Sequence, residues 1–296
     1  MGAIDFGKRQ WQWALLLLLA FVWGSSFIMM KKALLTFTDM QVAAFRMFIA
    51  FAVLIPAIVP NLKHLEGKAI LAFMAVGVFG NGVPAFLFAT AQTVVDSALA
   101  GMLNSLVPLF TLLVGLTFFK VPLRRLQLGG VSIGLAGAIL LIYSSAGNVE
   151  GPGENWGYSF LVIAASFCYA ISVNVIKEYL QGYSPAAITG LALLFFGPAC
   201  GIYVFGFTDF TDRMAEPDAW WHLGYLVVLG VVGTAMAVLL FNKLISNTTA
   251  LFASSVTYLI PGVALFWGLL DGESIGWMEL VGIAIILLAV RLIRGK

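Results

Sequence analysis

Charged residues are scarce in this chain of 296 residues. They make up 10% of the sequence, and hydrophobic residues make up 61%, whereas about a quarter of a soluble domain is normally charged. A water-soluble fold of this length needs far more polar cover than these residues can give. The sequence therefore excludes a soluble globular protein and predicts one whose solvent is the lipid bilayer. The net charge of +2 gives no indication of nucleic acid, and no nucleic-acid partner is predicted.

Cysteine and histidine are also rare, with two of each. Cys168 and Cys200 lie in apolar stretches without metal-ligand spacing, so we expect buried thiols and no metal or cofactor. His64 and His222 lie outside the apolar runs. An intramembrane enzyme would need an aspartate pair, a zinc motif, or a serine with a histidine at membrane depth. None of these is present, so no catalytic residue is predicted.

Acidic residues are absent from the middle of every apolar run. A proton-coupled carrier usually keeps a protonatable group in its transport path. The absence favours facilitated diffusion or exchange. A proton-coupled drug or metabolite efflux antiporter remains an alternative, through a carboxylate at the end of a run.

Ten stretches are long and apolar enough to cross a bilayer, which takes about 20 residues as a helix. Each run is continuously apolar rather than alternating, which indicates helices and not barrel strands. The first run follows two basic residues and has no cleavage site, so it is expected to be retained. The predicted class is an all-α integral membrane protein. The predicted spans are Trp13–Met30, Met40–Val59, Ala69–Ala91, Ser97–Phe119, Gln127–Tyr143, Tyr158–Val175, Ala186–Phe205, His222–Phe241, Thr248–Leu270 and Trp277–Leu292.

The fourth and ninth runs repeat each other at a spacing of 153 residues, which places Pro108 on Pro261. Glycines and a phenylalanine in the neighbouring runs match at the same spacing. With five spans in each half, the second half must enter the membrane from the opposite side, so the sequence predicts two inverted repeats. The expected repeats are residues 11–143 and 158–293, joined by a polar linker at 144–157.

Lysine and arginine are distributed unevenly between the two sides. If the N-terminus lies inside, twelve of the 16 lysines and arginines also fall on the inner side. Three fall on the outer side (Lys31, Lys32 and Arg213), and Arg46 lies within a span. Positive charge collects on the cytoplasmic side of membrane proteins. We therefore expect a multi-pass protein of the cell (inner) membrane with both termini cytoplasmic.

Short motifs in the spans resemble a known family. Trp23–Phe27 (WGSSF), Phe45-Arg46 and the proline-centred fourth and ninth spans resemble the EamA type of the drug/metabolite transporter superfamily. The resemblance covers nearly the whole chain as two repeats. Lys120 departs from the pattern, because the first repeat of such proteins often has an acidic residue there, whereas Glu273 fits. The resemblance implies ten helices and export or exchange of small metabolites, such as amino acids, through a central cavity.

Arg46 is the one charge at membrane depth, and it has two interpretations. Its planar fork suits a substrate carboxylate or phosphate. Alternatively it pairs with Asp39 two turns away, extends to the interface or caps helix carbonyls.

Other polar and aromatic residues recur at matched depths in the two halves. Each is open to a packing role as well as to contact with a substrate. Proline interrupts three of the spans, and Pro84, Pro108 and Pro261 are expected to bend them. The candidate substrate-binding residues are Asn81, Asn104, Thr234, Thr257, Tyr258, Trp23, Tyr169 and Arg46.

Together these features predict a transporter of small metabolites, most simply amino acids or similar zwitterions, working by alternating access as an exporter, facilitator or exchanger. An intramembrane enzyme or a non-transporting membrane scaffold is the competing class, and a scaffold should lack a polar pathway. The expected partners are a small-molecule substrate and the lipid bilayer. We expect a monomer, and a dimer remains possible.

Overall fold

The computed structural model describes residues 8–120, 125–146 and 155–294, and within these ranges the chain is helical without any strand. The α-helices are α1 (Arg9–Ala33), α2 (Asp39–Ile58), α3 (Gly67–Gly77), α4 (Val83–Ala91), α5 (Ser97–Asn104), α6 (Val107–Phe118), α7 (Arg125–Ala146), α8 (Asn155–Tyr179), α9 (Pro185–Leu194), α10 (Gly197–Phe207), α11 (Ala219–Gly230), α12 (Ala237–Asn247), α13 (Ala250–Ser254), α14 (Ile260–Leu270) and α15 (Trp277–Arg294). The 3₁₀-helices are η1 (Val59–His64), η3 (Asp212–Ala215) and η5 (Ser255–Tyr258). The π-helices are η2 (Val78–Gly82) and η4 (Val231–Met236).

Eight helical stretches in the described residues are long and apolar enough to cross a membrane, and two shorter apolar helices lie in α7 and α15. The all-α membrane class is therefore confirmed, and the helices fall where the ten spans were predicted. Spans three, four, seven, eight and nine are each divided: they consist of α3–η2–α4, α5–α6, α9–α10, α11–η4–α12 and α13–η5–α14.

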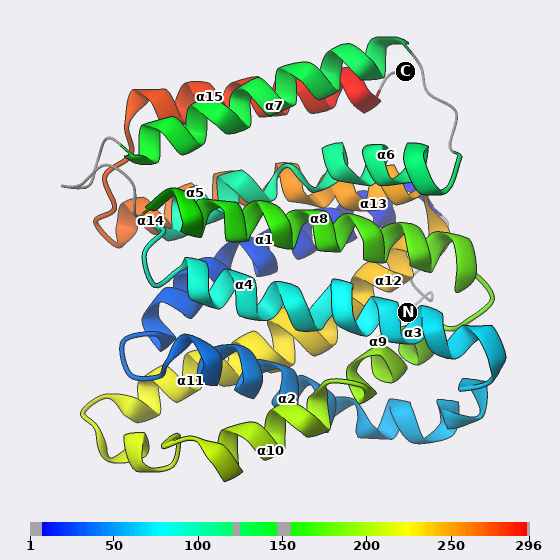
Figure 1. Ribbon diagram of the computed structural model, residues 1–296, viewed down its shortest axis with the longest axis vertical. Coiled ribbons are helices and arrows are strands. Elements are labelled where there is room, and N and C mark those ends of the chain that lie inside the picture. Colours follow the sequence, from blue (N-terminus) through cyan, green and yellow to red (C-terminus); the bar gives the residue numbers. More distant parts are fainter. Residues whose placement is uncertain (1–7, 121–124, 147–154, 295–296) are drawn as a thin grey trace.

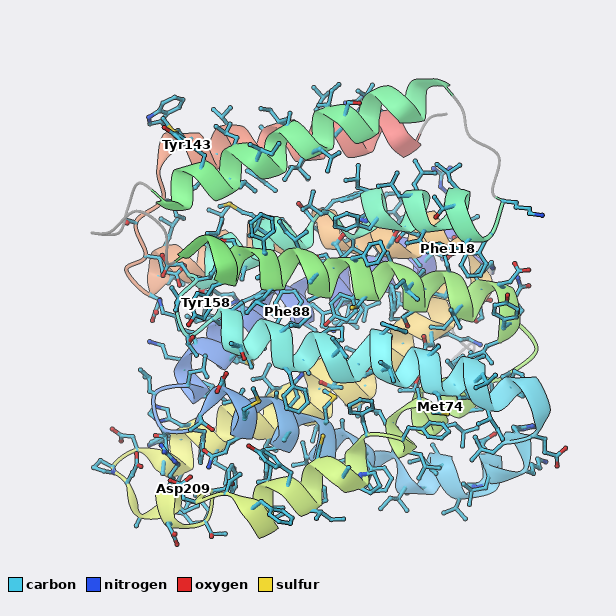
Figure 2. The ribbon with its side chains drawn as sticks, viewed as in Figure 1. Met74, Phe88, Phe118, Tyr143, Tyr158 and Asp209 are labelled. Atoms are coloured by element: carbon cyan, nitrogen blue, oxygen red, sulfur yellow. The ribbon has the colours of Figure 1, made fainter. Side chains whose placement is uncertain are left out.

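The helices form a stack of layers (Figure 1). Helices α7 and α15 lie together as an outer layer at the top of the view, while α2, α10 and α11 lie at the opposite edge. Phe88 lies inside the bundle, whereas Phe118 and Tyr143 lie at its outer surface (Figure 2). Exposed apolar side chains of this kind suit contact with lipid tails.

Spans three and eight each contain a short π-helix, η2 and η4, whose first residues lie 153 residues apart (78 and 231). A π turn widens the helix by one residue and leaves local carbonyl groups without their usual α-helical donors. The same distortion at the same place in both halves shows that the repeat extends from sequence to backbone geometry.

Two close helix crossings also repeat, with the halves exchanged. A Cβ on Gly77 would lie 2.4 Å from the carbonyl oxygen of Ala192, and one on Gly230 would lie 3.2 Å from that of Arg46. The glycines are 153 residues apart, and their partners are 146 apart (46 and 192). Span three of the first half thus crosses span seven of the second, as span eight crosses span two. The two halves interlock by equivalent contacts.

We expect Gly230→Ala to destabilise the protein by about 1–3 kcal/mol, because the added methyl would also lie 1.9 Å from Ile49 Cγ2 and overpacking of this kind forces neighbours apart. Gly224→Ala is the matched control in the same helix, since a Cβ there meets nothing within 4 Å. Thermal unfolding in detergent measures both. Equal melting temperatures would contradict the close crossing.

An ionic cluster, made of Lys31, Lys32, Ser97, Asp271 and Glu273, ties three spans together at one end of the bundle. Lys31 Nζ lies 2.7 Å from Glu273 Oε1 and 3.0 Å from Asp271 Oδ2, and Lys32 also pairs with Asp271. Glu273 Oε1 accepts hydrogen bonds from the Ser97 amide and hydroxyl. The cluster therefore joins the end of α1, the start of α5 and the loop after α14.

The carboxylates of this region have opposite pKa shifts. Burial by itself would raise the pKa of Glu273, but hydrogen bonds from Lys31, Ser97 and the Ala98 amide outweigh it and hold the pKa below its usual value. Burial, together with the negative charge of Glu273, raises the pKa of neighbouring Asp96. Glu273 is thus held as a carboxylate, while Asp96 binds a proton more readily than an exposed aspartate.

Candidate functional site

A central cavity of about 110 Å³ lies between the divided spans three, four, eight and nine and the continuous spans one, two and six. A single water needs only roughly 10–15 Å³, so the cavity has room for a small metabolite. Seven of the eight predicted site residues line it. They are Trp23, Arg46, Asn81, Asn104, Tyr169, Thr234 and Thr257.

Tyr258 is the predicted site residue that is not among the residues lining the cavity. It follows Thr257 in η5, a 3₁₀ turn in which neighbouring side chains point about 120° apart. Because Thr257 faces the cavity, Tyr258 faces another direction.

Arg46 is buried, and its Nε donates to Thr234 Oγ1 at 2.7 Å. The Thr234 hydroxyl donates its hydrogen to Leu229 O at 2.9 Å, so its oxygen can accept the hydrogen bond from Arg46. Among the described residues no carboxylate lies within 4.0 Å of the guanidinium. The alternative partner, Asp39, instead accepts from Thr90 at 2.6 Å. The cavity wall therefore carries a cation that pairs with no carboxylate of the described residues.

The two π turns supply matched polar side chains. Asn81 Nδ2 donates a hydrogen bond to the carbonyl oxygen of Val76, five residues earlier, at 3.4 Å. Thr234 Oγ1 donates in the same way to the carbonyl oxygen of Leu229, also five residues earlier. Trp23 Nε1 donates to Gly233 O at 2.9 Å within η4. These side chains satisfy carbonyls that the wider turns release.

Two aromatic pairs flank the cavity in matched positions. Trp23 meets Phe241 edge to face with ring centroids 5.0 Å apart, and Tyr169 stacks on Phe88 at 6.0 Å. Such pairs pack apolar surface and hold the rings rigidly. An apolar portion of a ligand would therefore meet preformed walls in both halves.

Asn104 and Thr257 occupy equivalent places in spans four and nine but differ in bonding. Thr257 Oγ1 donates to Ser254 O at 2.9 Å. The Oδ1 atom of Asn104 is buried and has no hydrogen-bond partner among the described residues. Asn104 thus brings to the cavity wall a side-chain amide that makes no hydrogen bond to the described residues.

The three prolines each lie in the first turn of a new helix: Pro84 in α4, Pro108 in α6 and Pro261 in α14. A missing N–H does no harm there because that position has no intrahelical acceptor. In spans four and nine the interruption just before the proline places Asn104 and Thr257 at the cavity.

Sequence reasoning missed four polar lining residues: Ser26, Ser172, Asn242 and Ser254. For the first two a pattern was available. They lie 146 residues apart, as Trp23 and Tyr169 do. Each also packs on the glycine of a π turn in the opposite half, Ser172 on Gly80 and Ser26 on Gly233. Asn242 has no such pattern, because its counterpart is Ala89.

Comparison with known proteins identifies the class. The model of the EamA-like transporter family matches residues 10–143 and again residues 156–295. The chain therefore belongs to the EamA-like transporter family and is a membrane transporter with two EamA repeats. This confirms the resemblance that the motifs of the first, second, fourth and ninth spans carry.

Several relatives that match over most of their length are named as transporters or efflux pumps. The chain is 26% identical to the uncharacterized inner membrane transporter YedA of Escherichia coli (strain K12), over 93% of this chain and 88% of the relative. It is 24% identical to a probable amino-acid metabolite efflux pump of Salmonella typhimurium (strain LT2), over 92% and 91%. It is also 24% identical to an S-adenosylmethionine/S-adenosylhomocysteine transporter of Chlamydia trachomatis serovar L2, over 94% and 88%.

A protein of known crystal structure shares the fold. The two superpose with a TM-score of 0.65 over 96% of each chain at 16% sequence identity. That likeness concerns the arrangement of helices alone.

Proposed function

We propose that this protein moves small zwitterionic metabolites, most simply neutral amino acids, across the cell (inner) membrane. The observation that carries the proposal is Arg46, a buried cation on the cavity wall with no carboxylate of the described chain beside it. A charge at membrane depth is costly unless something neutralises it, and a bound carboxylate fits the guanidinium fork. The aromatic pairs would hold the apolar part of such a molecule.

The names of two relatives support this proposal. The Escherichia coli relative is named an inner membrane transporter, and the Salmonella relative a probable amino-acid metabolite efflux pump. The proposed activity, export or exchange of an amino acid, agrees with the name of the Salmonella relative. One chain suffices, because the cavity is lined by residues from both halves of a single molecule.

Transport would occur by alternating access between the two halves, which enter the membrane in opposite orientations with both termini cytoplasmic. The equivalent glycine crossings support this scheme, since matched interfaces allow the halves to exchange conformations. The ionic cluster then lies on the outer side, where Lys31 and Lys32 are expected from the distribution of charge.

Coupling to protons is not part of the proposal. Among the residues that the structure describes, no aspartate or glutamate lines the cavity, so these residues offer no carboxyl group to carry a proton there. The protein is proposed to work as a facilitator or exchanger.

The test is counterflow in liposomes containing the purified protein. Labelled leucine, phenylalanine and serine are compared with a sugar, a nucleoside and a cationic dye. We expect flux of at least one neutral amino acid, with initial rates equal within twofold with and without an imposed pH gradient. Flux of the dye alone, driven by the pH gradient, would instead support a proton-coupled efflux antiporter. An absence of flux for every class would overturn the proposal.

A further inference from the structure

The ionic cluster connects the two repeats through all of its ion pairs. Lys31 and Lys32 lie in the first stretch that matches the family model, and Asp271 and Glu273 lie in the second. Ser97, whose amide and hydroxyl both donate to Glu273, also lies in the first. A motion that separates the repeats at this end must therefore break every one of these contacts.

Further contacts between α1 and α14 continue from the cluster to the cavity. Trp267 Nε1 in α14 donates to Ser25 Oγ in α1 at 2.8 Å. A Cβ on neighbouring Gly24 would lie 2.5 Å from Val263 Cβ, which shows how closely the two helices approach there. Met30, next to the first lysine of the cluster, lines the cavity. The cluster thus joins α1 to the end of α14 at the end of the cavity where Met30 lies.

Two matched positions at the opposite end of the bundle carry like charges. At the 146-residue spacing the counterpart of Lys31 is Lys177, and at the 153-residue spacing the counterpart of Glu273 is Lys120. Two cations repel each other, whereas a cation and a carboxylate attract. Lys177 instead donates to two backbone carbonyl oxygens of the second repeat, at 3.2 and 2.6 Å. Since Lys177 itself belongs to that repeat, these contacts do not join the two halves.

The other two matched positions do not replace the ion pair. The counterparts of Lys32 and Asp271 are Glu178 and Phe118. Phe118 has no charge, and Glu178 is exposed and pairs with no cation among the described residues. In the part of the chain that the structure describes, ion pairs therefore join the two halves at one end of the bundle and not at the other.

We infer that the ionic cluster is a gate that holds the outer end of the transport path closed. The inference rests on the proposed function for alternating access. Contacts that exist in one of two conformations favour that conformation by their own free energy. While the end is closed, loss of Lys31 leaves the Glu273 carboxylate buried without its cation, which is costly. Water reaches the carboxylate once the end opens, so the open conformation gains population.

The gate is tested by the access of a membrane-impermeant thiol reagent to the cavity. Val107→Cys places the target on the cavity wall, in a protein that also carries Cys168→Ala and Cys200→Ala. The rate of modification is measured from each side of the membrane, in right-side-out and inside-out vesicles.

A second reporter identifies the side on which the ionic cluster lies. Asp212 is exposed, and the next residue, Arg213, donates to the carbonyl oxygen of Thr36 in the loop after α1. Asp212→Cys therefore reacts from the side of the cluster. The comparison of rates is then independent of the predicted orientation.

We expect Lys31→Met to raise the rate from the cluster side by about tenfold, as loss of a hydrogen bond to a charged group implies. The rate from the other side should stay level or fall, because the two conformations share one population. Lys31→Arg keeps the cation and should stay within about twofold of the parent protein on both sides. Higher rates from both sides in Lys31→Met, or an unchanged rate from the cluster side, would overturn the gate.

Two further variants control for folding and for charge. Lys32→Met removes a single ion pair and should raise the cluster-side rate by a smaller factor, so it carries the test if Lys31→Met yields no folded protein. Lys120→Met is the matched control at the other end of the bundle. It removes an exposed cation and should change the cluster-side rate by less than about twofold. A rise in Lys120→Met equal to that in Lys31→Met would also overturn the gate.

Transport by the same proteins separates the gate from the proposed function. A cluster-side rate that rises in Lys31→Met, in a protein that transports no amino acid, would support the gate and refute amino acid transport. Leucine counterflow together with unchanged modification rates in Lys31→Met would refute the gate and leave the proposed function standing.

Discussion

Replacing Arg46 with glutamine is expected to lower leucine counterflow by about 30-fold or more at low substrate concentration. Removing one partner of a buried charged hydrogen-bonded pair costs about 2–5 kcal/mol, and every 1.4 kcal/mol is about a tenfold change in affinity. Arg46→Lys should recover part of the activity, because lysine restores the charge but not the planar fork. The initial rate of counterflow in liposomes measures all three proteins.

Two controls distinguish substrate contact by Arg46 from a structural role. Thr234→Val removes the hydrogen bond to Arg46 Nε but keeps the cation, so it should reduce leucine transport far less than Arg46→Gln does. Leucinol has no carboxylate, so its binding should change by less than about twofold in Arg46→Gln. If leucine and leucinol lose affinity equally, Arg46 acts through the fold of the protein and the carboxylate subsite is wrong.

Replacing Glu273 with glutamine is expected to destabilise the protein by about 3–5 kcal/mol, the usual cost of breaking a buried ion pair by removing one partner. The Glu273 side chain is 2% exposed. Besides Lys31, it accepts from Ser97 and, through Oε2, from the Ala98 amide at 3.0 Å. A glutamine has one acceptor oxygen in place of two and must leave some of these donors unpaired. Thermal unfolding in detergent at neutral pH measures the loss.

Acid should have the same effect on the wild-type protein. The pKa of Glu273 is lowered in the folded state, so its carboxylate adds stability that is complete above its ordinary value of 4.5 and is lost as the pH falls through the lower folded-state value. This contribution should be missing from the pH profile of Glu273→Gln. An unchanged acid limb in that variant would contradict the assignment.

Asp96→Asn is the control for negative charge beside this cluster. The pKa of Asp96 is raised, by burial first and then by Glu273, so the folded state disfavours its negative charge near neutral pH. Its removal should leave stability unchanged or improve it slightly, since the Asp96 side chain makes no capping hydrogen bond to α5 that asparagine would lose. A large loss in Asp96→Asn would mean that the cluster depends on total negative charge rather than on the Glu273 contacts.

The sequence was sufficient to predict the class of fold. Long uncharged runs leave a helix as the simplest structure that satisfies its own backbone in lipid, so the spans could be placed from composition. It did not reveal the division of spans three and eight by π turns, because a π turn depends on side-chain packing from other helices. The glycines at 80 and 233 marked the right place, but their contacts with Ser172 and Ser26 became visible only in three dimensions.

Seven of the eight residues predicted from the sequence line the cavity, and several of them were chosen because the two halves match. Asn81, Thr234, Asn104 and Thr257 were found because the repeat places polar residues at equal depths, and all four line the cavity. Asn242 was missed because its counterpart is an alanine. Tyr258 was included because apolar helices do not show which face points inward. Substrate contact by any of these residues stays a prediction.

The equivalent crossings of Gly77 on Ala192 and Gly230 on Arg46 have an evolutionary consequence. They hold a nearly symmetric frame around the cavity, and such a frame accepts a ligand equally well in two opposed orientations. Under the proposed function, the choice between them depends on which half carries the arginine. Under the same proposal, an arginine at position 192 in place of the one at position 46 would turn the ligand end for end. In a duplicated architecture, the direction in which a molecule lies can be inherited or reversed by very few substitutions, without any change in the scaffold.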